Sequence, residues 1–229
     1  MADGRRPVFA SPTASLAAGE APLGDEARAL LANDPAPVPY LNALAARGLF
    51  ADAVQFLAHA LPKREAVWWA CLCSREAQGA SISAEAEAAL RAAERWAAGP
   101  DEPSRRAAEA AAALAGVGTP AGCAATAAFW SEGSLAPPHV QDVPPPLYLT
   151  ARGVAGSVLL AAVATEPERA GERFRRFLAL GLDVASAANL WQAIAPIRPP
   201  SPSSPVSSPA PLAPRPIQRP IRRPDQWES

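Results

Sequence analysis

An unbroken apolar run extends from Ala66 to Cys73, and Pro62 stands four residues before it. A proline is well tolerated in the first turn of a helix, because the N–H group that it lacks has no partner there. The pattern predicts a helix from Lys63 to Gln78 whose middle is apolar around its whole circumference. Such a helix is stable only at the centre of a bundle, where other helices surround it. The run therefore indicates an all-α protein.

Most of the chain between residues 25 and 192 has a helical pattern interrupted by glycine and proline. Ser83 and Asp101 have the character of N-caps, and Gly48 and Gly79 fall where helices should end. No segment shows the alternation of a β-strand. We expect helices over residues 26–32, 40–47, 51–60, 63–78, 84–97, 104–115, 121–130, 152–165, 168–180 and 185–193. The short joints between them favour helical hairpins and a compact bundle of short helices.

Three segments differ in composition from this helical body. Residues 1–22 carry scattered Gly, Pro and Ser without periodicity, and residues 197–229 are rich in proline and serine. Such segments cannot form a packed core, so the sequence predicts one helical domain over residues 25–192 between two disordered tails. A proline-rich joint over residues 133–150 interrupts the domain. A joint of this length is typical of a lid, a docking strap or a subdomain boundary.

The C-terminal tail contains a basic repeat of proline and arginine that ends in a tryptophan. Polyproline helices bind aromatic grooves, and neighbouring arginines set their orientation. The alternative is an inert linker. The candidate docking residues are Arg215, Pro216, Arg219, Pro220, Arg222, Arg223 and Trp227.

Charge and cysteine content limit the compartment and the partners. The formal net charge is −1, so the chain lacks the basic surface of a nucleic-acid-binding protein. The longest apolar run, Val154 to Ala164, has eleven residues, whereas a membrane-spanning helix needs about 20. Three cysteines without an export signal are typical of a reducing compartment. We expect a cytoplasmic protein that binds neither nucleic acid nor membrane.

The large apolar residues are expected to be core anchors rather than a binding site. Phe56, Trp68 and Trp69 are the candidates, and the two tryptophans point about 100° apart on a helix. Cys71 and Cys73 point about 200° apart, so they cannot share one zinc ion. The sequence therefore predicts buried free thiols, no metal and no cofactor.

Lys63, Arg64 and Glu65 form the charged first turn of the predicted central helix. The positive end of the helix dipole disfavours the two cations there. Glu65 or an acidic neighbour offsets this repulsion in one interpretation, and the three residues then form a polar cluster that fixes a helix corner. In the other, the cations and free N–H groups bind an anionic group of a partner.

No catalytic motif is present: the chain lacks a Gly-x-Ser-x-Gly elbow, a phosphate loop and a dinucleotide fingerprint. We expect a non-catalytic interaction protein. The alternative is a small helical enzyme or ligand-binding bundle that uses a pocket near Trp68, Trp69, His59 and Cys71.

The run from Asp52 to Cys71 resembles the hallmark of an uncharacterised bacterial helical family, a domain of unknown function. The resemblance is most specific over Pro62 to Trp69, and the prolines at 144–146 and the helix start at 149–152 are similar too. It implies a helical domain over about residues 29–192 with no established activity and no catalytic residues. It also implies genes near contractile (type VI) secretion clusters, and hence an adaptor or accessory protein with protein partners.

Overall fold

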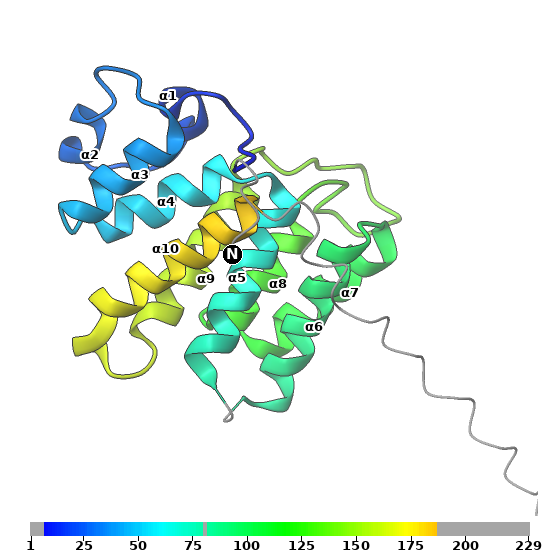
Figure 1. Ribbon diagram of the computed structural model, residues 1–229. Helices are drawn as coiled ribbons and strands as arrows, with labels where there is room; N and C mark the ends of the chain where they lie inside the picture. Colours follow the sequence, from blue (N-terminus) through cyan, green and yellow to red (C-terminus); the bar gives the residue numbers. More distant parts are fainter. Residues whose placement is uncertain (1–6, 80–81, 187–229) are drawn as a thin grey trace, which may run out of the picture. The chain divides into compact units, whose positions relative to one another are not determined.

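The computed structural model describes residues 7–79 and 82–186, which are helical and contain no strand (Figure 1). This confirms the predicted all-α fold. The elements in chain order are α1 (Ala14–Ala18), α2 (Asp25–Ala29), α3 (Pro37–Ala46), α4 (Phe50–Ala60), α5 (Lys63–Gln78), α6 (Ala84–Ala98), α7 (Glu102–Ala115), α8 (Pro120–Phe129), α9 (Leu149–Val163), the 3-10 turn η1 (Pro167–Arg169) and α10 (Ala170–Ser186).

Helix α5 lies among α4, α6, α8, α9 and α10 and contacts all five (Figure 1). Its residues from Ala66 to Cys71 are all buried. Trp69 and Phe56 are fully buried, and the indole Nε1 of Trp69 donates to the carbonyl oxygen of Phe177 in α10 at 2.7 Å. Helix α5, whose middle is apolar around its whole circumference, is therefore surrounded by other helices.

Small residues allow these helices to approach closely. Every alanine of α8 is buried, in a chain whose apolar content of 49% consists in large part of alanine. Gly181 of α10 faces α4 and α5, and a Cβ atom at this position would lie 2.5 Å from Leu57 Cδ2 and 3.0 Å from Trp69 Cε2. Only glycine fits at such a contact, so close packing here depends on the absence of a side chain.

The prediction of a disordered arm over residues 1–22 is wrong for residues 7–22. Helix α1 forms there, capped by the Thr13 side chain, and its residues Ala14, Ala17 and Ala18 are buried. The backbone N–H of Val8 also donates to the carbonyl oxygen of Ala185 at 2.8 Å. A five-residue helix is too short to show periodicity in sequence, and its order comes from tertiary contacts.

The predicted break between residues 180 and 185 is absent from the structure. Helix α10 continues through Gly181 to Ser186, where a break had been predicted, because packing against α4 and α5 favours the glycine. The end of the predicted helix 185–193 lies outside the described residues. Among the described helices, none alone has the length and apolar composition needed to cross a membrane; only α9 taken with Pro167–Ser186 does, and a 117° bend separates these two.

Candidate functional site

The longest described segment without a helix joins α8 to α9, and we call residues 130–148 the clamped loop. The sequence predicted a proline-rich joint at 133–150, and Thr150 instead lies in α9. Loops carry most binding residues in proteins, provided that a rigid scaffold positions them. The scaffold here is the first turn and a half of α7.

The start of α7 places two arginines side by side with one acid. The Asp101 carboxylate accepts from the Ser104 N–H at 2.7 Å, and the Ser104 hydroxyl completes a capping box. Glu102 precedes Arg105 by three residues and Arg106 by four, which puts all three on neighbouring positions of the helix surface. The spacing of these residues therefore places the Glu102 carboxylate next to the guanidinium groups of Arg105 and Arg106.

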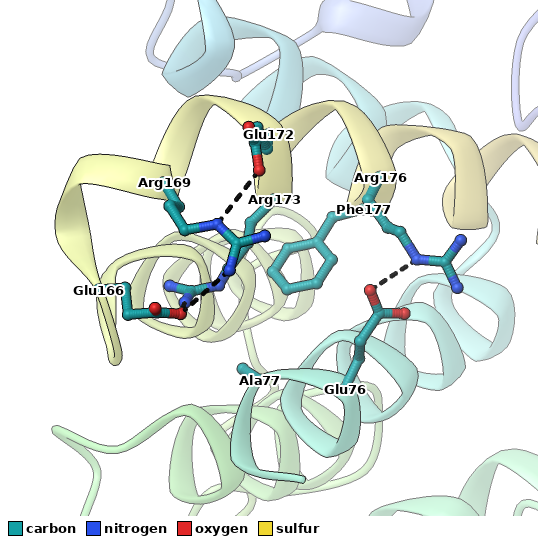
Figure 2. A pocket seen from close by; sticks show the side chains of 8 residues that line it. All are labelled: Glu76, Ala77, Glu166, Arg169, Glu172, Arg173, Arg176 and Phe177. Atoms are coloured by element: carbon teal, nitrogen blue, oxygen red, sulfur yellow. Dashed lines mark hydrogen bonds and ion pairs between the residues drawn. The ribbon is translucent and has the colours of Figure 1, made fainter.

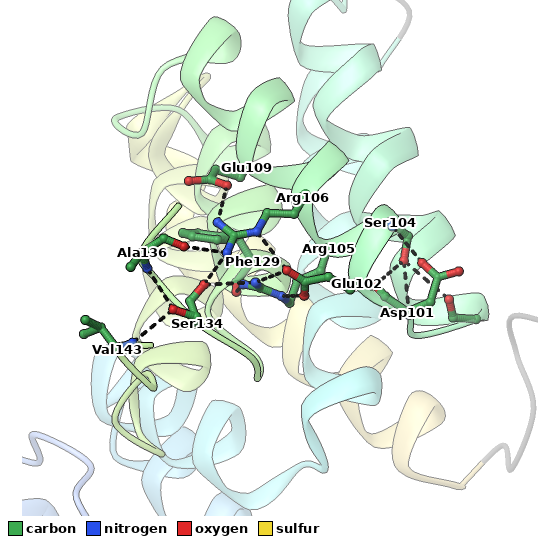
Figure 3. Close-up of polar contacts among 11 residues, drawn as sticks. Asp101, Glu102, Ser104, Arg105, Arg106, Glu109, Phe129, Ser134, Ala136 and Val143 are labelled. Atoms are coloured by element: carbon green, nitrogen blue, oxygen red, sulfur yellow. Dashed lines mark hydrogen bonds and ion pairs between the residues drawn. The ribbon is translucent and has the colours of Figure 1, made fainter. Parts of the chain in front are cut away.

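Arg105 is buried, with 1% of its surface exposed, and every nitrogen of its guanidinium group donates a hydrogen bond. Nε and Nη2 donate to the Glu102 carboxylate at 2.6 and 2.8 Å. Nη1 donates to the carbonyl oxygen of Phe129 at 2.7 Å, and Nη2 also donates to that of Ser134 at 3.0 Å. One side chain thus links α7 to the end of α8 and to the clamped loop (Figure 3).

Arg106, the next residue of α7, also binds the clamped loop. Its Nη2 donates to the carbonyl oxygens of Ser134 at 2.9 Å and Ala136 at 2.7 Å, while Glu102 and Glu109 accept from its other nitrogens (Figure 3). Both guanidinium groups lie over the Phe129 ring, at 4.8 and 5.4 Å from its centroid. Cation–π contacts of this kind add to the hydrogen bonds.

Glu102 is the acid that these two arginines share. Hydrogen bonds, chiefly from Arg105, lower the pKa of Glu102 to about 2, against a smaller opposing contribution from burial. The same carboxylate raises the pKa of Arg106 further above its already high value. Glu102 and Arg106 are therefore both charged at neutral pH, and the charge-assisted hydrogen bond between them keeps its full strength there.

The loop also binds to itself through Ser134. Its hydroxyl accepts from the N–H groups of Ala136 at 3.1 Å and Val143 at 3.0 Å, and the Leu135 N–H donates to the Val143 carbonyl at 2.8 Å. Gly133 has a φ of 68°, and a Cβ atom there would lie 3.0 Å from Arg105 Nε. Glycine is required at this turn both by the backbone angle and by the guanidinium group beneath it.

On its outer side the clamped loop exposes apolar side chains. Val140, Val143 and Leu147 are all exposed, Leu147 to 84%, and the neighbouring residues Pro144 and Pro146 are exposed too. A groove of about 500 Å³ runs beside the loop, lined in part by Glu102, Arg106, Asp142 and Pro144. The loop therefore exposes several apolar side chains beside a groove that charged residues line in part.

Lys63, Arg64 and Glu65 do not gather into one cluster. Lys63 Nζ donates to the carbonyl oxygen of Ser131, at the start of the clamped loop, and burial lowers the pKa of Lys63. Arg64 donates to the carbonyl oxygens of Ala97 and Ala98 at 2.9 and 3.0 Å, at the end of α6. Each cation thus interacts with a helix C-terminus, the end that favours positive charge. Glu65 is partly exposed in the first turn of α5.

The residues proposed for a rival pocket are mostly core residues. Trp68, Trp69 and Cys71 are buried, and burial raises the pKa of the Cys71 thiol well above its usual value. His59 Nδ1 lies 2.8 Å from the Gln55 carbonyl oxygen, and burial lowers the pKa of the imidazole. Within residues 7–79 and 82–186, no group of three or more His, Cys, Asp or Glu side chains has the arrangement of a metal site.

A second surface cavity, of about 270 Å³, lies between the end of α5 and the start of α10 (Figure 2). Three arginines line it, and each is paired with a glutamate. The pairs, with N···O distances of 2.7, 3.2 and 3.3 Å, are Arg176–Glu76, Arg169–Glu172 and Arg173–Glu166. Because the lining charges balance, this cleft does not have the positive potential of an anion site.

The tail candidates Arg215, Pro216, Arg219, Pro220, Arg222, Arg223 and Trp227 lie outside the described residues.

A model of a family of unknown function, DUF6931, matches residues 40–185. The chain belongs to this family. The predicted membership in a family of unknown function is thereby confirmed. Comparison with curated proteins and with solved structures found no match. The DUF6931 match includes α4 to α9, and so contains both arginines and the whole clamped loop.

Sequence reasoning did not identify Arg105 and Arg106 in this DUF6931 chain as supports of the loop. Their acceptors lie 24 to 30 residues away and are backbone carbonyls, which carry no side-chain signal. The available signal was local: two adjacent arginines follow Glu102 by three and four residues, in a helix otherwise rich in alanine. That spacing is typical of a bridged carboxylate.

Proposed function

We propose that this protein is a non-catalytic interaction module that offers the clamped loop to a protein partner. The observation that carries the proposal is the exposure of Val140, Val143 and Leu147 on a backbone anchored by Arg105 and Arg106. Exposed apolar groups that cluster on one element are typical of interaction sites.

The anchoring matters for affinity as well as for shape. A free loop loses conformational entropy when a partner orders it, and that loss weakens binding. Here six hydrogen bonds already restrict the backbone of residues 133–143. The two arginines donate three of them to the carbonyls of Ser134 and Ala136. Two more run from the N–H groups of Ala136 and Val143 to the Ser134 hydroxyl, and the sixth joins the Leu135 N–H to the Val143 carbonyl. A preformed loop binds with a smaller entropy loss.

The proposal places the protein as an adaptor or accessory component of a larger assembly. The cytoplasm is the proposed compartment, supported by three cysteines without an export signal. The resemblance of the run from Asp52 to Cys71 supports a bacterial setting near a contractile (type VI) secretion system. The proline–arginine repeat beginning at Arg215 is the proposed contact to a second partner, on the basis of its composition. The net charge of −1 supports protein rather than nucleic acid as the partner.

Site-specific photocrosslinking in the native cells tests this function. A photoreactive phenylalanine analogue replaces Leu147 in one variant and Leu114 in the other. Leu114 is the matched control, because it is 76% exposed but lies on α7 away from the loop. The proposal predicts a discrete protein adduct from position 147 and none from position 114. Equal adducts from both positions, or none from position 147, would contradict it.

A further inference from the structure

We infer that the partner binds residues 143–147 of the clamped loop as a polyproline ligand, in a groove lined by aromatic side chains. The sequence of this segment is Val143-Pro144-Pro145-Pro146-Leu147. The inference rests on the proposed function and names the class of partner that the loop fits.

The segment is fixed at both ends. At the first end, Val143 exchanges hydrogen bonds with the turn at residues 134–135, its N–H with the Ser134 hydroxyl and its carbonyl with the Leu135 N–H. At the other end, the Pro146 carbonyl accepts from the Leu149 N–H at 3.1 Å, where α9 begins. Between these points each proline ring fixes its own φ near −65°. The segment therefore has little conformational freedom to lose on binding.

The segment also shows the two features that aromatic grooves bind. Its rings and flanking side chains are accessible: Pro144 and Pro146 are exposed, Val143 is 50% exposed and Leu147 is 84% exposed. Among the described residues, no backbone N–H donates to the carbonyls of Pro144 and Pro145. Such carbonyls accept hydrogen bonds from indole or phenol groups of a groove, while the proline rings pack on its aromatic faces.

Charged residues on the two sides of residues 143–147 determine the direction in which this segment binds a groove. Asp142 and Glu132 are exposed on its N-terminal side. On the C-terminal side, the Arg152 guanidinium group lies over the Tyr148 ring, at 4.4 Å from the centroid. A complementary groove therefore carries a basic residue where it meets Asp142, since opposite charges orient a partner and raise its association rate.

Isolated polyproline-binding domains are the probes for this inference. The purified full chain is titrated into SH3, WW and EVH1 domains and profilin, and binding is followed by the fluorescence of the aromatic residues in each groove. We expect saturable binding to at least one probe. We expect Leu147→Ser and Pro146→Ala to weaken it by at least about tenfold. Leu114→Ser, which removes a similarly exposed leucine from α7, should leave the binding unchanged.

The outcomes separate the two proposals. Binding that no loop substitution weakens overturns the polyproline inference, and so does the absence of binding to every probe. If the photocrosslink from position 147 still forms in that case, the proposed interaction function stands, and the partner binds the loop without an aromatic groove for polyproline. If the crosslink is absent as well, both proposals fail. Circular dichroism verifies that each variant is folded; the substituted side chains are exposed, so the fold should tolerate them.

Discussion

Replacing Arg105 by methionine should destabilise the protein more than replacing any other arginine of α7. Methionine preserves much of the apolar volume but donates no hydrogen bonds. The substitution leaves the carbonyl of Phe129 without this donor and leaves that of Ser134 with Arg106 alone. It also removes one of the two arginines that bind Glu102.

The magnitude follows from how deeply each group is buried. Each hydrogen bond from a charged group contributes about 1.5–3 kcal/mol, and Arg105 makes two to buried or half-buried carbonyls. Glu102 is 54% exposed, so solvent screening limits that ion pair to less than about 1 kcal/mol. The cost of burying the guanidinium group is recovered on substitution, which reduces the sum. We therefore expect a loss of about 3–5 kcal/mol.

Urea unfolding followed by circular dichroism measures this loss as a lower midpoint at an unchanged slope. Arg106→Met is the matched control: its side chain is 21% exposed, and we expect a loss of about 1–2 kcal/mol. Arg105→Lys retains the charge without the planar donor fork, so it should recover less than half of the loss. A loss below about 1 kcal/mol for Arg105→Met would refute the assignment of Arg105 as the buried link between α7, the end of α8 and the clamped loop.

Three further predictions concern acid stability, packing and thiol reactivity. Because folding lowers the pKa of Glu102 from 4.5 to about 2, the carboxylate contributes to the free energy of unfolding above pH 4.5, and this contribution is lost as the pH falls toward 2. Glu102→Gln should therefore make stability less dependent on pH in that window, by less than about 1 kcal/mol because the carboxylate is screened by solvent. Gly181→Ala should destabilise the protein by about 1–3 kcal/mol in thermal unfolding, because the new Cβ meets α4 and α5. Gly156→Ala is the control: its Cβ would lie 3.7 Å from its nearest neighbour, so the change should be neutral or stabilising by up to about 1 kcal/mol. Equal effects of Gly181→Ala and Gly156→Ala would contradict the packing argument. In the native protein, a thiol reagent should modify only Cys123, and it should do so slowly because burial raises the pKa of this thiol. Reaction of all three cysteines before unfolding would contradict the burial of Cys71 and Cys73.

The fold was largely predictable because its signals are local. The predicted helix Lys63–Gln78 matches α5 at both ends, since a proline, a glycine and an apolar run define it within the sequence itself. The arm before residue 23 was not predictable in this way. Its helix α1 has five residues, and contacts such as that from Val8 to Ala185 join positions far apart in the chain.

The site was only half predictable. The proline-rich joint was evident from composition, but its attachment was not, because its acceptors are backbone carbonyls presented by a particular loop conformation. Lys63 and Arg64 were expected to act together, since they are adjacent in sequence. Their long side chains extend to different helix ends, a choice that depends on where α6 and α8 end in space. Tertiary geometry, not residue type, decides such contacts.

Hydrogen exchange of the loop amides tests most directly whether the clamped loop is preformed. The Val143 N–H donates to the Ser134 hydroxyl, and the Leu135 N–H donates to the Val143 carbonyl, although both residues belong to a segment without helix or strand. We predict that both amides of the unbound full-length protein exchange at least about 100-fold more slowly than in an unstructured peptide. We also predict that Arg105→Lys removes much of this protection. Exchange of both amides at the unstructured rate in the wild-type protein would contradict the account.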